Sequence, residues 1–161
     1  MASTGLETMR ELGQAVAAAS GAAELLVGIP ALNQARSVGR VVERVAAGLA
    51  KLDGVAAAIV VVDAGSQAGT VDAVPRGASG EPLRRVVRLP APSPRGRALL
   101  AILAGAAAVG ARACVVVDAG LESLTPEGLD RLARPVLQGE ADYVSPTYSH
   151  TASEGTLTTN L

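Results

Sequence analysis

The chain has 161 residues, which is typical of one domain of ordinary size or of part of a larger one. Apolar residues make up 49% of it, enough for a substantial core, so an intrinsically disordered chain is not expected. The 14 basic and 15 acidic residues nearly cancel, and the aromatic residues are two tyrosines, which argues against binding to nucleic acid or to an anionic membrane.

Residues 1–23 are rich in alanine, and we interpret them as a flexible or loosely helical lead before a domain at 24–161. The segment 15–23 is similar to the apolar region of a signal peptide, but Glu7 and Glu11 precede it where positive charge is typical. No stretch of about 18 apolar residues lacks a charge, so a transmembrane helix is not expected. We therefore expect a cytoplasmic protein without a membrane span.

From residue 24 onward the apolar periodicity switches between that of a strand and that of a helix. The predicted elements are a strand at 24–30, a helix at 38–52, a strand at 57–62, a short helical stretch at 70–74, a strand at 84–89, a helix at 97–109, a strand at 113–117, a helix that begins at Thr125 and a strand at 142–146. Pro135 is expected to break or kink the last helix. The strands are apolar on both faces, which predicts an α/β fold with a mostly parallel sheet and helices on both faces.

The single cysteine, Cys114, excludes an internal disulfide bond and a cysteine-rich zinc site. Because it lies inside the apolar run 113–117, we interpret it as a small buried hydrophobic residue and not as a nucleophile.

Two of the predicted strands are followed by aspartate. Asp63 comes directly after the strand at 57–62, and Asp118 after the strand at 113–117. Ligands of parallel α/β sheets bind at the carboxyl ends of the strands, so both carboxylates are expected to point into that crevice. The sequence thus predicts a site for a small, nucleotide-like molecule.

Short polar motifs follow the first two strands. The first strand ends in Ile29-Pro30, and Asn33 follows three residues later. The second strand is followed by a glycine- and serine-rich turn whose polar positions include Asp63, Ser66 and Thr70. Taken alone, these motifs also fit an ordinary strand end and a capped turn.

Two more motifs lie further along the chain. In the segment 94–99, glycine lets the backbone approach a ligand, and Arg95 is a cation that suits phosphate. A solvated loop with two arginines is the alternative interpretation. The strand at 113–117 is followed by Asp118-Ala119-Gly120, which has one carboxylate.

Taken together and in this order, the motifs resemble those of family 2-like glycosyltransferases, the nucleotide-diphospho-sugar transferases of the GT-A fold. The resemblance covers residues 24–161 and implies the N-terminal half of a Rossmann-like sheet that binds a nucleoside diphosphate sugar and transfers a hexosyl group to an acceptor hydroxyl. The nucleotide-binding residues that it implies are Pro30, Asn33, Asp63, Ser66, Arg95 and Asp118. No catalytic residue is assigned.

Three C-terminal segments, 121–127, 142–148 and 155–161, resemble one branch of that family, the glucosyl-3-phosphoglycerate and mannosylglycerate synthases. This resemblance implies a second set of residues near the sugar or the acceptor: Thr147, Tyr148, Gly155 and Thr156.

The chain departs from the family pattern in its metal motif. An Asp-x-Asp pair in the family holds magnesium or manganese, which neutralises the diphosphate leaving group. Here Asp118 is the first aspartate, and Gly120 stands where the second would be, so Asp118 is a weak metal ligand by itself. Arg95 and Arg97 are cations that could act on the diphosphate instead.

Relatives continue beyond the segment that ends at residue 161, so the chain is expected to be incomplete at its C-terminus or to be completed by a partner chain. A non-catalytic nucleotide-sugar-binding or regulatory domain of the same fold is therefore an alternative to an enzyme. A dinucleotide-binding protein is a third possibility, but it requires a Gly-x-Gly-x-x-Gly turn after the first strand, where the chain has residues 30–33, Pro-Ala-Leu-Asn.

Overall fold

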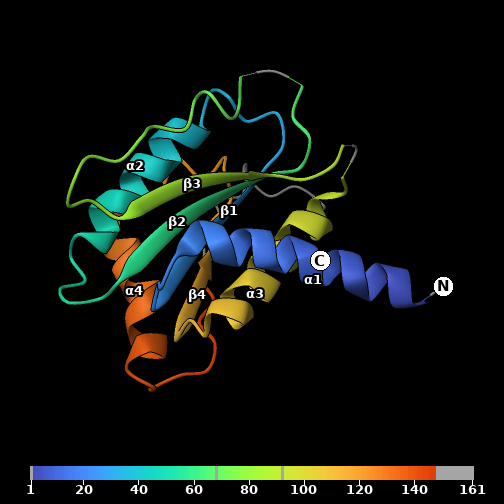
Figure 1. Ribbon diagram of the computed structural model, residues 1–161. Helices are drawn as coiled ribbons and strands as arrows, with labels where there is room; N and C mark the ends of the chain where they lie inside the picture. The colour runs from blue at the N-terminus through green and yellow to red at the C-terminus, as the bar shows by residue number, and fades with distance from the viewer. Residues whose placement is uncertain (1, 68, 92, 148–161) are drawn as a thin grey trace.

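Strands and helices alternate along the computed structural model except at Ala57–Asp63 and Leu83–Arg88, which are successive strands; the model describes residues 2–67, 69–91 and 93–147 (Figure 1). The elements are α1 (Ala2–Ser20), β1 (Leu25–Ala31), α2 (Val38–Leu49), β2 (Ala57–Asp63), β3 (Leu83–Arg88), α3 (Arg95–Val109), β4 (Ala113–Val116) and α4 (Pro126–Leu137). The predicted α/β class is confirmed.

The described strands form one sheet in the order β3-β2-β1-β4, and every pairing in it is parallel. β1 is central: Leu25 pairs with Ala57 of β2 on one side and with Ala113 of β4 on the other. The carboxyl ends of all four strands therefore lie at the same edge of the sheet, and β4 is an edge strand.

Each face of the sheet is covered by a pair of helices. Val27 and Ile29 of β1 pack into a cluster with residues of α2 and α4, whereas Leu26 packs into a separate cluster with residues of α1 and α3. This alternation follows from the two-residue period of a strand. The predicted arrangement, with helices on both faces, is thus confirmed.

Glycines allow the helices on the α1–α3 face to approach closely. A Cβ atom on Gly28 of β1 would lie 2.2 Å from Ile102 of α3. A Cβ atom on Gly105 of α3 would lie 2.4 Å from Val16 of α1. Both distances are too short for a real contact, so the packing of α3 onto the sheet and of α1 onto α3 depends on these glycines.

The N-terminal segment differs from its interpretation as a flexible or loosely helical lead. Residues 2–20 form one helix, and its contacts with α3 make it part of the packed domain. Leu12 and Val16, one helical turn apart, are buried against α3. None of the helices in the described part of the chain is long and apolar enough to cross a membrane.

Two local predictions are wrong, and of the two outcomes predicted for Pro135 the break does not occur. The predicted fifth strand at 142–146 is not hydrogen-bonded to the sheet, and Pro146 has no N–H to donate to a ladder. The predicted helical stretch at 70–74 is a turn, closed by a bond from Ala73 N–H to the Gly69 carbonyl (3.0 Å). Pro135 does not break α4, which continues to Leu137, because a proline in the last turn removes a single backbone hydrogen bond.

Candidate functional site

Three loops meet at the carboxyl edge of the sheet: residues 32–37 after β1, 64–70 after β2 and 117–124 after β4. The start of α3 at Arg95 reaches the third of these loops through an ion pair with Asp118. These loops together with the start of α3 are called the carboxyl edge below. They carry four of the six predicted nucleotide-binding residues, Asn33, Ser66, Arg95 and Asp118; Asp63 is the last residue of β2, and Pro30 is buried within β1.

Hydrogen bonds join the first two loops. Asn33 has a left-handed backbone, with φ of 55°, and its N–H donates to Oγ of Ser66 at 2.8 Å. In return, the N–H of Gln67 donates to Oδ1 of Asn33 at 3.0 Å. Ser66 also donates its hydroxyl proton to Oδ1 of Asp63, which accepts the Ser66 N–H as well, at 3.1 Å. Asn33, Asp63 and Ser66, singled out by separate sequence motifs, therefore form one connected unit.

Asp63 is completely buried, with no exposed surface. Its second oxygen, Oδ2, has no hydrogen-bond partner among the described residues and lies 3.4 Å from Nε of Arg88, whose side chain is 66% exposed. The expectation that this carboxylate points into an open crevice is therefore wrong. A buried carboxylate that accepts two hydrogen bonds from Ser66 holds the loop in place, so Asp63 acts through its neighbour.

Asp118 has both carboxylate oxygens engaged. Oδ1 accepts the N–H of Gly120 at 2.7 Å, and Oδ2 forms an ion pair with the guanidinium of Arg95. The pair is accessible, since the Asp118 side chain is 42% exposed and that of Arg95 is 65% exposed. Two residues from different predicted motifs thus meet, although their sequence positions gave no indication that they pair with each other.

Asp63 and Asp118 lie at the same edge but not next to each other. Asp63 is in register with Ala31 of β1, and the N–H of Val117 donates to the Gly28 carbonyl at 3.0 Å, so β1 runs between the two aspartates. Two strand spacings of about 4.8 Å each separate their backbones, about 10 Å in total. A single ion could not be held by both, but an extended molecule could lie across both strand ends.

Gln34 links the first loop to the second and lies beside the third. Its N–H donates to Oγ1 of the buried Thr70 at 3.1 Å, and its Oε1 accepts the Ser37 hydroxyl at 3.0 Å. A Cβ atom on Gly120 would lie 3.8 Å from the same Oε1, so the Gln34 amide borders the third loop. Sequence reasoning missed Gln34, because a glutamine after a strand has no distinctive pattern.

Two arginines of α2 hold the third loop. Arg40 donates to both carboxylate oxygens of Glu122, each at 2.8 Å. Arg44 donates to the carbonyls of Glu122 and Leu124, the latter at 3.2 Å. The hydrogen bond and the positive charge of Arg40 lower the pKa of Glu122 below its ordinary value. Arg40 and Arg44 are one helical turn apart, and this spacing is the sequence feature that could have indicated a shared partner.

The divalent cation implied by the family resemblance does not fit these residues. Magnesium requires about six oxygen ligands in near-octahedral geometry. Asp118 is already occupied by a guanidinium and a backbone N–H, and Gly120 offers no side chain. Among the described residues no cluster of three or more His, Cys, Asp or Glu side chains could hold a metal ion.

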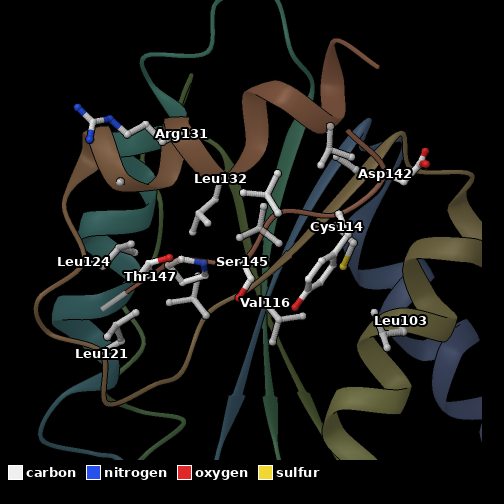
Figure 2. Close-up of a pocket in the computed structure, with 18 of the residues that line it drawn as sticks. Leu103, Cys114, Val116, Leu121, Leu124, Arg131, Leu132, Asp142, Ser145 and Thr147 are labelled. Atoms are coloured by element: carbon white, nitrogen blue, oxygen red, sulfur yellow. The ribbon is translucent and has the colours of Figure 1, made fainter. Parts of the chain in front are cut away.

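A separate groove of about 1070 Å³ lies along the outer edge of β4, between α3, α4 and residues 142–147 (Figure 2). Leu103, Val116 and Leu132 give it an apolar lining, as Figure 2 shows. Thr147, predicted to lie near the sugar or acceptor, lines this groove. Tyr148, Gly155 and Thr156 lie outside the described residues.

Cys114 also lines the groove and is half-buried. Burial raises the pKa of its thiol to about 11, which disfavours the thiolate. The raised pKa disfavours a nucleophilic role, but the prediction of a buried residue is wrong, because Cys114 is only partly buried at the edge of the groove.

Comparison with known protein families gives a match to the model described as glycosyl transferase family 2, over residues 26–160. The matched range contains the whole sheet apart from the first residue of β1, and all three loops of the carboxyl edge. No curated protein matches the chain.

Proposed function

The chain belongs to glycosyl transferase family 2, and from this premise we propose that it binds a nucleoside diphosphate sugar at the carboxyl edge of its sheet. One observation carries the proposal: residues from separate motifs, Asn33 with Ser66 and Arg95 with Asp118, converge at this edge. Ligands of parallel α/β sheets bind where the strands end, so this is the edge at which a nucleotide is expected.

The residues suit different parts of such a ligand. The exposed Asn33 and the half-exposed Ser66 offer hydrogen-bonding groups for the base and ribose. The exposed guanidinium of Arg95 has the planar donor geometry that binds phosphate oxygens in pairs. Asp63, being buried, supports Ser66 and is a positioning residue in this account.

The reaction proposed for the family fold is hexosyl transfer. The bond between the anomeric carbon and the diphosphate oxygen breaks, and a bond forms from that carbon to an acceptor hydroxyl, which gives up its proton. The branch resemblance suggests glycerate or phosphoglycerate as the acceptor, with Thr147, Tyr148, Gly155 and Thr156 near the sugar or acceptor. A non-catalytic nucleotide-sugar-binding domain is the second candidate, and the glycine at position 120 favours it.

Thermal unfolding with a panel of nucleoside diphosphate sugars tests the binding proposal. A ligand at a hundred times its Kd stabilises a folded protein by about 2.7 kcal/mol, a rise in Tm of about 5–10 °C for a chain of this size. Uridine or guanosine diphosphate sugars should give such a rise, and free hexose phosphates should not. The absence of protection by any nucleoside diphosphate sugar would overturn the proposal.

Asn33→Gly is the informative variant, because glycine keeps the left-handed backbone of this position while removing the side chain. It should reduce the ligand-induced rise in Tm. Asp63→Ala is less informative, since loss of a buried carboxylate lowers stability by itself. Ser79→Ala, in the exposed loop between β2 and β3, is the control and should leave the rise unchanged.

A turnover assay distinguishes the hexosyltransferase from the non-catalytic binding domain. Release of nucleoside diphosphate that depends on glycerate or phosphoglycerate supports an enzyme of the resembled branch. Binding without any turnover supports the non-catalytic domain.

A further inference from the structure

We propose that the guanidinium of Arg95 takes the place of a divalent cation, so that a nucleoside diphosphate binds here without metal and competes with Asp118 for Arg95. This inference rests on the proposed function and concerns the same site. Its starting point is the disagreement between the metal motif expected of the family and the donors present at the carboxyl edge.

A divalent cation at Asp118 would lack oxygen ligands. Oδ1 of Asp118 is held by the N–H of Gly120 at 2.7 Å, and Oδ2 by Arg95. A Cβ atom on Gly120 would lie 3.2 Å from Oδ1 of Asp118, so this position borders the carboxylate but supplies no second one. A metal ion would have to displace a positively charged group to gain a single carboxylate ligand.

The site already holds the positive charge that a divalent cation would supply. Arg95 already provides a positive charge at the point where a cation would neutralise the diphosphate, and a guanidinium remains charged at all physiological pH values. Its side chain is 65% exposed, so phosphate oxygens can reach it from solvent. A bound divalent cation and the guanidinium would repel each other at the same carboxylate, which makes them alternatives to each other.

The ion pair between Arg95 and Asp118 is exposed to solvent. Ion pairs between exposed side chains are weak, because water screens both charges. A diphosphate carries more negative charge than a carboxylate and can accept two parallel hydrogen bonds from a guanidinium. The diphosphate is therefore able to displace Asp118 from Arg95. Asp118 then opposes nucleotide binding, whereas in a metal site the aspartate would be required for binding.

The test measures the Kd of uridine diphosphate and guanosine diphosphate by calorimetry, in EDTA and in manganese, for the wild type and two variants. Manganese should change the wild-type Kd by less than about twofold. Asp118→Asn keeps the shape of the side chain but removes its charge, and it should tighten binding in EDTA by about two- to fivefold, the value of an exposed ion pair. Arg95→Gln should weaken binding by about tenfold or more, as expected for the loss of charge-assisted hydrogen bonds.

Two exposed residues away from the site serve as charge-matched controls. Asp53→Asn, between α2 and β2, changes the net charge as Asp118→Asn does, and Arg76→Gln, between β2 and β3, changes it as Arg95→Gln does. Both controls should leave the Kd within about twofold of the wild type. Equal Tm values for all variants would show that each is folded.

The outcomes are distinguishable. If the wild type binds a nucleotide only with manganese, or if Asp118→Asn weakens binding, the metal-free account is overturned while the proposed function stands. If the wild type binds neither nucleotide under either condition, the proposed function fails, and this inference fails with it.

Discussion

Ser66 accepts a hydrogen bond from the backbone N–H of Asn33 at 2.8 Å, which joins the loop after β1 to the loop after β2. The same hydroxyl donates to the buried carboxylate of Asp63. The strand-end aspartate thereby fixes the position of a loop on the neighbouring strand. An aspartate with no exposed surface thus helps to hold two surface loops together through Ser66.

Replacing Ser66 with alanine should separate these loops. The Asn33 N–H loses its acceptor, and Asp63 keeps only one of its two hydrogen bonds from position 66. We expect a loss of unfolding free energy of about 1–3 kcal/mol, together with weaker nucleotide protection. Urea unfolding measures the stability, and Ser79→Ala is the control. Equal midpoints for the two variants would contradict this role.

A methyl group at Gly105 should weaken the contact between α1 and α3. Its Cβ would lie 2.4 Å from Cγ1 of Val16, so Gly105→Ala should cost about 1–3 kcal/mol despite the higher helix propensity of alanine. Gly96→Ala is the matched control, because Gly96 lies in the same helix and a Cβ atom added there would have no atom within 4 Å. Thermal unfolding compares the two. A Gly105→Ala variant as stable as Gly96→Ala would show that α1 does not pack here.

The link between Glu122 and Arg40 should make stability depend on pH in the acid range. Because the folded pKa of Glu122 is lowered from its ordinary value of 4.5, the stabilisation is complete above that value and is lost as the pH falls through the folded pKa. Glu122→Gln should therefore have a lower Tm than the wild type at pH 7, and the difference should close as the pH falls below 4.5 and through the folded pKa. Arg40→Gln should reproduce this behaviour. A difference that is independent of pH would argue against the ion pair.

Cys114 should react slowly with alkylating reagents. Burial raises its pKa from 9.0 to about 11, which leaves roughly a hundredfold less thiolate at neutral pH. Alkylation by iodoacetamide at pH 7.5 should be roughly a hundredfold slower for the folded protein than for the chain in urea. Mass spectrometry follows the reaction. Similar rates in both states would mean that the thiol is not shielded as described.

The sheet could be predicted from the sequence because its strands are continuous apolar runs. The strand predicted at 57–62 is β2, which in the structure extends to Asp63. The helix predicted from Thr125 is also present, since Thr125 accepts the N–H of Gly128 as an N-cap. Such features depend on neighbours in the sequence, and local patterns reveal them.

The remaining features depend on contacts between distant segments. Asp63 is in register with Arg88 of the neighbouring β3, whose Nε lies 3.4 Å from Oδ2, and strand order is not visible in local sequence. The hydrogen bonds from Arg40 to Glu122 likewise join α2 to a loop far along the chain. The packing of α1 was missed because an alanine-rich segment gives a weak periodic pattern.

Binding at the carboxyl edge is tested most directly by NMR of the ¹⁵N-labelled protein during titration with uridine or guanosine diphosphate. The account predicts that the largest chemical-shift changes fall on the amides of Asn33, Ser66 and Gly120, which belong to the three loops. Changes confined to the groove between α3, β4 and α4, or no changes with either nucleotide, would contradict it.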